Sequence, residues 1–423
     1  MPPGNVIIAQ SGGPSPVINN TLRAIINSCR SDPQNFGKIY GAWHGIEGVL
    51  KEELLDITAQ DSKEIELLRN TPAAGSIGTC RYKIKEGNEN DLNRITEVFI
   101  AHNIGYFFYI GGNDSQHTSL KIGEKCKETG LEVVTVGVPK TIDNDLGDDG
   151  FKLIDHTPGY GSVARYWCCY TQNLNEENRG SSPADPVMVV QAMGRRTGFI
   201  PAAARLADPQ REMPLQIYLA ESGLSFPELA ENVKSCLGLH GRCMVIVSEG
   251  MSAGTEGSEK DSFGHIQYGS AKTNIQQAVV NYLNDSGIKA RGQVPGTDQR
   301  HAMVYASETD LLEAYRVGEK AAEIALEGQN GWMATLIREA GPDYNICYDK
   351  VALEKMALSE RVFPVKWISG NRYDVTDEYI EYALPLIGSE WVRIPLENGR
   401  QRFASFKPVF AEKKLNKYIP ENY

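Results

Sequence analysis

Residues that could bind a phosphate group follow a short apolar run near residue 110 of the sequence. The stretch YFFYIGGNDS places Gly112, Asn113 and Asp114 directly after that run. Glycines at such a position let a backbone approach a ligand closely, and the ligand is very often a phosphate. A carboxylate at Asp114 is therefore unexpected, because it would repel an anion bound beside it.

Two further glycine-rich stretches could bind anions. In SGGPSPVINN, Ser11, Gly12 and Gly13 precede a helix-like pattern and could present bare backbone N–H groups. Taken alone, this stretch is explained more simply as a tight strand–helix turn. The loop GSIGTCRYK adds Arg81 and Lys83.

The stretch VPKTIDNDLGDD combines one amine with several carboxylates. A solvated acidic loop explains the final GDD, but it explains TIDND poorly, because TIDND follows an apolar run and a proline. Lys140 lies beside Asp143 and Asp145, a pair that suits one general base and one group that orders Mg²⁺ or phosphate.

Three later stretches supply more charged side chains. MGRRTG contains Arg195, VSEG contains Glu249 and VPGTDQRH contains Arg300. Each of these residues alone is more often a surface or salt-bridged side chain. Together with the stretches above, they form a set suited to phosphoryl transfer. The Walker Lys-Ser/Thr and the HRD and DFG motifs are missing from the sequence, which excludes a P-loop enzyme and a protein kinase.

These residues need a scaffold that brings strand ends together. Short apolar runs bounded by glycine alternate with segments of helical spacing, for example NVIIAQ, YFFYI, EVVTVGV, VMVVQAMG and RCMVIVSEG. This alternation predicts a doubly wound α/β fold, in which ligands bind beyond the carboxyl ends of the strands. The polar stretch Thr171–Pro186 is interpreted as a surface connection.

The overall charge excludes some classes of partner. The 423 residues carry a net charge of −11, which argues against nucleic acid or an acidic membrane as the main partner. The eight cysteines form no CxxC pair, and neither a signal peptide nor an apolar run of membrane-spanning length is present. We therefore expect a cytoplasmic protein. Residues 389–423 are predicted to be an irregular basic extension packed on an acidic body.

The motifs SGGPSPVIN, GSIGTCR, GGNDS, PKTIDND, TPGYGS, MGRRTG, VSEG and GTDQR resemble those of the phosphofructokinases, in the same order, from Asn5 to about Gly388. The resemblance implies two doubly wound, mainly parallel-sheet Rossmann-like domains with the active site in the cleft between them. It also implies a donor domain of residues 1–152 with about 308–368, and a sugar-phosphate domain of about 153–307 with 369–388.

Within the family, the sequence is similar to the pyrophosphate-dependent type. ATP-dependent members carry glycine at the positions of Asp114 and Lys140, which leaves room for a nucleotide. An aspartate where the α-phosphate of ATP would lie repels ATP by its charge and its bulk. Pyrophosphate has no third phosphate, and Lys140 can compensate charge on the departing phosphate.

The resemblance also assigns roles to single residues. Asp143 matches the general base, flanked by Thr141 and Ile142, and Arg195 matches a contact to fructose 6-phosphate and the transition state. The remaining matches are Met193, Gly194, Glu249 and Arg300 for the sugar phosphate, Gly12, Gly13, Arg81 and Gly112 for the donor, and Asn113 with Asp145 for Mg²⁺. A basic residue that reaches across subunits in bacterial ATP-type members is replaced here by Pro186.

The function implied is reversible, Mg²⁺-dependent transfer of a phosphoryl group from pyrophosphate to fructose 6-phosphate, by a homodimer or homotetramer. The alternatives are an ATP-dependent enzyme and a non-catalytic regulatory subunit that binds sugar phosphate. The regulatory alternative is disfavoured by the presence of both Asp143 and Arg195. A third alternative is a binding protein for an acidic partner, and the charge of the basic extension is its only support. Sedoheptulose 7-phosphate stays open as a second acceptor.

Overall fold

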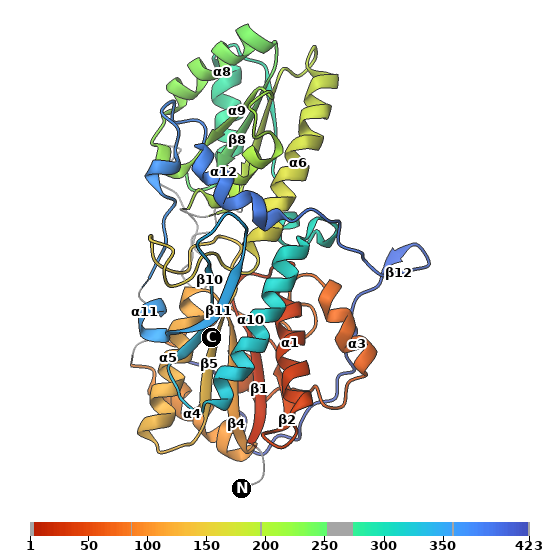
Figure 1. Cartoon of the computed structure of the whole chain (residues 1–423), viewed down its shortest axis with the longest axis vertical. Helices are drawn as coiled ribbons and strands as arrows, with labels where there is room; N and C mark the ends of the chain where they lie inside the picture. Colours follow the sequence, from red (N-terminus) through yellow and green to blue (C-terminus); the bar gives the residue numbers. More distant parts are fainter. Residues whose placement is uncertain (1–3, 86, 195–196, 252–273, 358, 422–423) are drawn as a thin grey trace.

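The computed structural model describes residues 4–85, 87–194, 197–251, 274–357 and 359–421. In Figure 1 the chain forms two bodies stacked along the long axis, each built on its own β-sheet. The larger sheet has the strand order β11-β10-β5-β4-β1-β2-β3. Its strands are β1 (Gly4–Gln10), β2 (Phe36–Ala42), β3 (Leu54–Asp56), β4 (Ile104–Gly111), β5 (Val134–Pro139), β10 (Trp332–Arg338) and β11 (Ile346–Ala352).

The central strands of the larger sheet are parallel and buried on both faces. Only the outer pairs, β10 with β11 and β2 with β3, run antiparallel. Along β1, Val6 and Ile8 belong to one apolar cluster, whereas Ile7 and Ala9 belong to another. The first cluster includes residues of α1 (Ile18–Ser31) and α10 (Glu308–Leu326), and the second residues of α4 (Glu89–Ala101) and α5 (Asn113–Glu128). Burial on both faces explains why these strands read as continuous apolar runs.

The smaller sheet is entirely parallel, with the order β7-β8-β6-β9. Its strands are β6 (Val187–Ala192), β7 (Leu215–Tyr218), β8 (Cys243–Ser248) and β9 (Ala290–Gln293), and its long helices are α6 (Tyr160–Ser181), α8 (Phe226–His240) and α9 (Ile275–Asp285). Odd and even residues of β6 again belong to different clusters. The doubly wound fold predicted from the sequence is therefore confirmed for both sheets.

Short helices complete the described chain. They are α2 (Ile46–Leu50), α3 (Ser62–Leu67), α7 (Phe199–Ala202), α11 (Leu353–Ala357) and α12 (Asp377–Ala383), with 3₁₀ turns η1 (Leu68–Asn70), η2 (Ala203–Ala207), η3 (Ala220–Ser222), η4 (Gly296–Arg300), η5 (Met303–Tyr305), η6 (Val365–Trp367) and η7 (Leu384–Ile387). The predicted domain limits stay a prediction, although strands β10 and β11 do return to the larger sheet.

One prediction about this scaffold was wrong. The stretch Thr171–Pro186 is not simply a surface connection, because α6 continues through it to Ser181. The helix buries polar side chains there: Arg242 donates hydrogen bonds to Asn175 Oδ1 (2.8 Å) and Asn178 Oδ1 (3.2 Å). A helix face that is buried through polar contacts has no apolar periodicity for the sequence to display.

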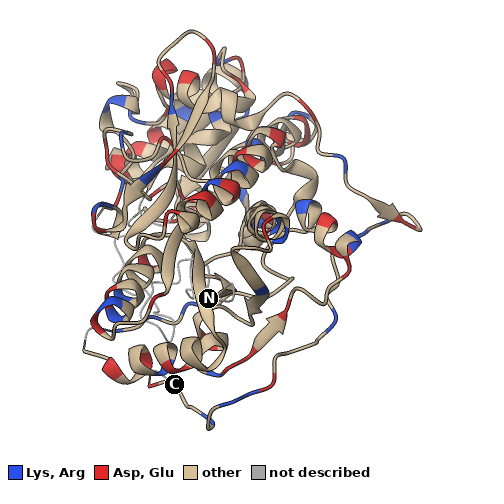
Figure 2. Cartoon of the chain, turned by 60° about the horizontal axis from the view of Figure 1, so that its bottom comes forward, with Lys and Arg blue, Asp and Glu red and all other residues tan. Residues whose placement is uncertain are grey.

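The C-terminal extension runs from the smaller body down the side of the larger one (Figure 1). Its only described strands are the hairpin β12 (Leu396–Glu397) and β13 (Arg400–Gln401), which projects from the body. Farther along, Asp56 N donates to Val409 O (2.8 Å) and Ala411 N to Leu54 O (2.8 Å). Basic residues are spaced along this segment in Figure 2, as the sequence predicts.

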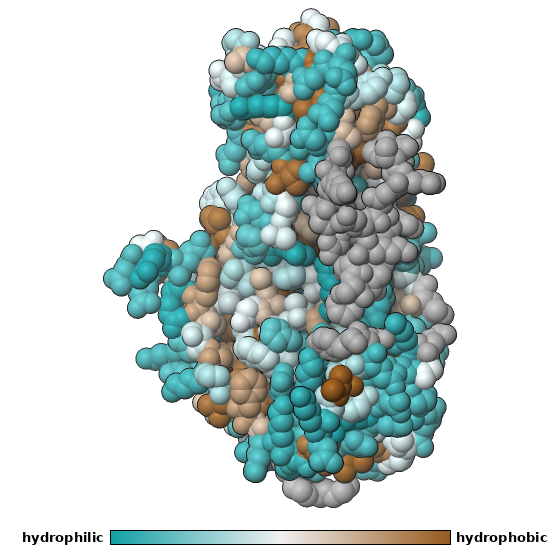
Figure 3. Space-filling view, turned by 180° about the vertical axis from the view of Figure 1, so that it is seen from behind, coloured by the Kyte–Doolittle hydropathy of each residue, from teal (hydrophilic) through white to brown (hydrophobic). Residues whose placement is uncertain are grey.

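The surface seen in Figure 3 is mainly hydrophilic, with apolar residues in small groups. None of the helices in the described ranges combines the length and the apolar character that a membrane span requires.

Candidate active site

The described candidate residues lie mainly at the carboxyl ends of parallel strands. In the larger sheet, Gly12 and Gly13 follow β1, Gly112 to Asp114 follow β4, and Lys140 to Asp145 follow β5. In the smaller sheet, Met193 and Gly194 follow β6, and Glu249 follows β8. Arg300 lies a few residues beyond β9, in η4, and Arg81 comes from a loop beside β1. The predicted Arg195 lies outside the described residues.

Lys140 is a buried amine at the centre of this arrangement. Its side chain is 2% exposed, and Nζ donates to Ser11 O (2.9 Å) and Gly13 O (2.5 Å). Burial lowers the pKa of Lys140 to about 7, against the opposing effects of Asp143 and Asp145. The ammonium group is therefore close to its titration point at neutral pH, and a bound anion would favour its charged form.

Two guanidinium groups meet Lys140 beside Gly13. A Cβ atom on Gly13 would lie 3.1 Å from Arg300 Nη1 and 4.0 Å from Arg81 Nη2. Burial and the nearby Arg81 both lower the pKa of Arg300, whereas Asp143 and Glu249 raise it. Three cations from different parts of the chain thus converge on one glycine, and such a cluster is favourable only when an anion joins it.

The prediction of bare amides at Ser11, Gly12 and Gly13 was wrong for Ser11, whose N donates to Ile110 O (2.8 Å), and for Gly12. Gly12 N donates to Cys80 O (2.9 Å), so this amide is already used. Gly12 has a φ of 78°, and glycine is needed there for the turn itself. The Gly13 amide has no hydrogen-bond partner among the described residues. Gly13 therefore offers an anion its N–H, whereas Gly12 shapes the loop.

Asp114 lies in the first turn of α5 and is paired with a cation. Lys83 Nζ lies 2.7 Å from Asp114 Oδ2, and both side chains are partly exposed. A carboxylate in the first turn of a helix is stabilised by the helix dipole. A carboxylate of the chain itself thus lies at this helix N-terminus, where an anion would otherwise be favoured. Lys83, which comes from the Arg81 loop, is brought here only by the tertiary fold.

The loop after β5 separates its two carboxylates by a left-handed residue. Asn144 has a φ of 57°, and its buried amide donates to Tyr382 Oη (2.9 Å). Asp143 N donates to Thr141 Oγ1 (3.1 Å), and Thr197 Oγ1 donates to Asp143 O (3.2 Å). The candidate base is therefore fixed from the strand-end loops of both sheets.

Beside this loop, Ile142 is 7% exposed and belongs to an apolar cluster of the smaller sheet. Ile142 therefore anchors the loop through packing, in addition to any contact with a substrate that the resemblance implies.

A buried oxygen near these carboxylates fits a metal ligand. Asn113 Nδ2 donates to Asp145 O (3.3 Å), whereas Asn113 Oδ1 is buried and has no partner among the described residues. Mg²⁺ prefers oxygen ligands and keeps several waters or phosphate oxygens. No group of three or more His, Cys, Asp or Glu side chains in the described ranges could hold a metal by itself. Asn113 and Asp145 therefore suit an ion completed by phosphate and water.

The smaller sheet contributes a second set of positioned groups. Gly194 N donates to Glu249 Oε1 (3.2 Å), and Gly194 has a φ of 130° that only glycine adopts readily. Met193 N donates to Gln299 Oε1 (3.2 Å), and Gln299 is 1% exposed. Gln299 therefore ties the loop after β6 to η4, which carries Arg300.

Thr197 and Gln299 were not identified from the sequence. Both lie within or beside recognised motifs, MGRRTG and GTDQR, so their positions carried a signal. A threonine hydroxyl and a glutamine amide are common polar groups, however, and their bonds join residues far apart in the sequence.

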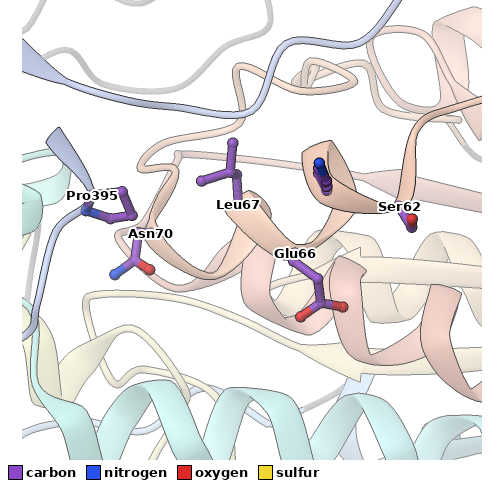
Figure 4. Close-up of a pocket in the computed structure, with 6 residues that line it drawn as sticks. Ser62, Glu66, Leu67, Asn70 and Pro395 are labelled. Carbon is purple, nitrogen blue, oxygen red and sulfur yellow. The ribbon is translucent and has the colours of Figure 1, made fainter. Parts of the chain in front are cut away.

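A surface pocket of about 360 Å³ lies elsewhere, and none of the candidate residues lines it (Figure 4). Five of its residues come from α3 and η1, and the sixth, Pro395, comes from the C-terminal extension.

A protein family with a similar sequence can be identified for this chain. The family model for phosphofructokinase matches residues 5–325, about three quarters of the chain. The chain belongs to the phosphofructokinase family. The match includes the candidate residues of both sheets described above.

Several relatives within the family resemble the chain over almost its full length. The pyrophosphate--fructose 6-phosphate 1-phosphotransferase of Halomonas elongata is 35% identical, with 98% of this chain and 99% of the relative covered. The protein of the same name from Methylococcus capsulatus is 34% identical, with 97% and 98% covered. The crystal structure of pyrophosphate-dependent phosphofructokinase from Marinobacter aquaeolei superposes with a TM-score of 0.88 at 34% identity, covering 99% and 100%.

Proposed function

We propose that the chain catalyses reversible transfer of a phosphoryl group from pyrophosphate to the 1-hydroxyl of fructose 6-phosphate. The observation that carries this proposal is the convergence of Lys140, Arg81 and Arg300 around Gly13, next to the loop of Asp143. Three cations can hold a strongly charged donor, and a carboxylate beside them can act as a base. The names of the similar full-length relatives support the same reaction.

In this mechanism, Asp143 accepts the proton of the sugar 1-hydroxyl. The sugar oxygen forms a bond to one phosphorus of pyrophosphate, the bridging P–O bond breaks, and phosphate leaves. Lys140, Arg81 and Arg300 offset the charge on the phosphate oxygens, and the Gly13 amide adds a hydrogen bond. In the reverse direction Asp143 returns the proton. One phosphoanhydride is exchanged for one phosphate ester, so both directions can run.

The sugar phosphate is held from the smaller sheet. Glu249 accepts hydrogen bonds from sugar hydroxyls, with Met193, Gly194 and Arg195 beside it. Thr141 and Ile142 line the boundary between donor and acceptor. We place Arg300 at the group in transfer, rather than at the 6-phosphate, because its guanidinium lies against Gly13 and near Arg81.

Mg²⁺ is the proposed cofactor. Asn113 Oδ1 and Asp145 would hold it, and a divalent ion supplies charge neutralisation at the phosphate oxygens. The proposed form is a cytoplasmic homodimer or homotetramer.

The choice of donor is the feature to test first. Initial rates with fructose 6-phosphate should be measured with pyrophosphate and with ATP at equal Mg²⁺, and in the reverse direction with fructose 1,6-bisphosphate and phosphate. We expect turnover with pyrophosphate as the donor and none with ATP. Equal or better turnover with ATP would replace this function by an ATP-dependent one. Binding of fructose 6-phosphate without turnover with either donor would favour a regulatory subunit.

A further inference from the structure

Arg81, which the proposed function assigns to the donor, and Lys83 lie on the same side of an extended segment. Cys80 pairs with Ser11 in a parallel bridge, and Cys80, Tyr82 and Ile84 are at most 8% exposed. Arg81 and Lys83, the alternate residues, are only partly buried. In an extended chain, successive side chains point to opposite sides. Packing of the buried side chains therefore determines where the side chains of Arg81 and Lys83 lie.

Tyr82 is held by a buried carboxylate. Its hydroxyl donates to Asp91 Oδ2 in α4, and Asn88 Nδ2 donates to the same oxygen (2.6 Å). Asp91 is 0% exposed, so removal of one donor would leave a buried acceptor under-satisfied.

The other oxygen of Asp91 is bound by the C-terminal extension. Tyr418 Oη donates to Asp91 Oδ1 (2.7 Å). Burial, and to a lesser degree this hydrogen bond, raises the pKa of Tyr418, so the hydroxyl stays protonated. The Arg94 guanidinium lies over the Tyr418 ring (5.4 Å) and donates to Asn416 O (3.0 Å). The segment around Tyr418 is thus bound to α4.

The residues before Tyr418 are held by hydrogen bonds from their backbone N–H groups to a side-chain carboxylate. Glu52, which is 1% exposed, accepts from Lys414 N (2.5 Å) and Leu415 N (3.1 Å). Leu415 and Tyr418 pack against the apolar cluster that contains Tyr82 and Ile84. Residues 411–418 therefore pack on the same apolar cluster as the buried side of the segment that carries Arg81 and Lys83.

We propose that the C-terminal extension positions the donor-binding loop, through the hydrogen bonds Tyr418–Asp91–Tyr82. Tyr418, Asp91 and Tyr82 are positioning residues, because none of them faces the cation cluster. This inference rests on the proposed function for its readout, since that function assigns Arg81 to the donor. It gives the extension a part in donor affinity, beyond packing.

The test compares Tyr418→Phe with Tyr344→Phe in the full chain. Tyr344 also donates its hydroxyl to a buried carboxylate, that of Glu313, but Tyr344 packs against the apolar cluster of the smaller sheet and not against the one that contains Tyr82. Tyr418→Phe should raise KM for pyrophosphate about fivefold, the equivalent of one hydrogen bond. KM for fructose 6-phosphate and kcat should stay within about twofold. Tyr344→Phe should leave both KM values unchanged.

Amide hydrogen exchange of residues 79–85 gives a second readout that needs no activity. Exchange there should be faster in Tyr418→Phe than in wild type and unchanged in Tyr344→Phe. Tyr82→Phe removes the hydrogen bond to the other oxygen of Asp91 and should also raise KM for pyrophosphate and speed exchange at residues 79–85. This variant provides the test if Tyr418→Phe does not fold.

The two proposals fail in different ways. Wild type without turnover from pyrophosphate would overturn the proposed function, whereas faster exchange at 79–85 in Tyr418→Phe would still support positioning. Normal exchange at 79–85 together with an unchanged KM for pyrophosphate would overturn positioning. A loss of thermal stability with equal changes in both KM values would also overturn it, since the extension would then act through global stability alone.

Discussion

Lys83 Nζ lies 2.7 Å from Asp114 Oδ2, and this pair links the loop that carries Arg81 to the first turn of α5. The carboxylate therefore does two things in the fold: it places a negative charge in the first turn of the helix, and it holds Lys83 of the loop that carries Arg81. Both effects disappear when Asp114 is replaced.

Asp114→Gly should make ATP a detectable donor. The substitution removes bulk and one negative charge where an α-phosphate would lie, and ATP-dependent turnover should rise at least about tenfold. Pyrophosphate turnover should fall, because Lys83 loses the partner that holds it. The matched control is Lys83→Met, which breaks the same pair but leaves the carboxylate, and which should not increase ATP use. If wild type already used ATP as well as pyrophosphate, Asp114 would have no part in excluding nucleotides.

Asp143→Asn should remove most of the turnover while folding and substrate binding persist. The amide has the same shape but cannot accept the proton, and loss of a general base typically costs about 10²–10⁴-fold in rate. Steady-state kcat and direct binding of fructose 6-phosphate measure the two effects separately. Asp149→Asn, at an exposed residue of the same loop, is the control and should behave as wild type. A near-normal kcat for Asp143→Asn would show that another group is the base.

Lys140 should make pyrophosphate binding depend on pH around neutrality. Its folded pKa of about 7 lies below the ordinary value of 10.5, so the free protein loses this charge as pH rises through 7. Affinity for pyrophosphate should therefore fall between about pH 6 and about pH 8. Lys140→Met should bind pyrophosphate more weakly and should lose this pH-dependent step. The variant thereby distinguishes titration of Lys140 from titration of pyrophosphate itself. The same step in Lys140→Met and wild type would assign it to the ligand.

Gly13→Ala should weaken donor binding without unfolding the protein. The added Cβ would lie 3.1 Å from Arg300 Nη1, so the guanidinium must move by a few tenths of an ångström. We expect KM for pyrophosphate to rise about tenfold, which corresponds to about 1.4 kcal/mol. Gly75→Ala is the matched control, because a Cβ there meets no atom within 4 Å. A rise confined to KM for fructose 6-phosphate would instead place Arg300 at the sugar 6-phosphate.

Asn113 should influence the requirement for Mg²⁺. Asn113→Ala removes the buried oxygen and should raise the Mg²⁺ concentration for half-maximal activity about tenfold, whereas Asn113→Asp should lower it, since a carboxylate is the stronger ligand. Mg²⁺ titrations of the initial rate at saturating substrates measure both, and removal of Mg²⁺ with a chelator should abolish turnover. If neither variant shifts the titration, the metal ligands lie elsewhere.

Much of the scaffold could be predicted from the sequence. Runs such as NVIIAQ and YFFYI are apolar throughout because helices cover both faces of a parallel strand, as Val6 and Ile7 show on opposite faces of β1. The candidate site could be predicted in outline for a related reason. The carboxyl ends of parallel strands share one edge of a sheet, so the residues that follow the runs, such as Gly13 and Asp143, must lie near one another.

The contacts that give the site its charge were decided only by the tertiary structure. Arg300 meets Gly13, and Lys83 meets Asp114, across long stretches of chain. The C-terminal extension returns to α4 through Tyr418 and Asp91. No local pattern encodes such pairs, because a charged side chain looks the same in the sequence whether it faces water or a partner. Backbone geometry, and the burial that lowers the pKa of Lys140, come from packing of the whole chain.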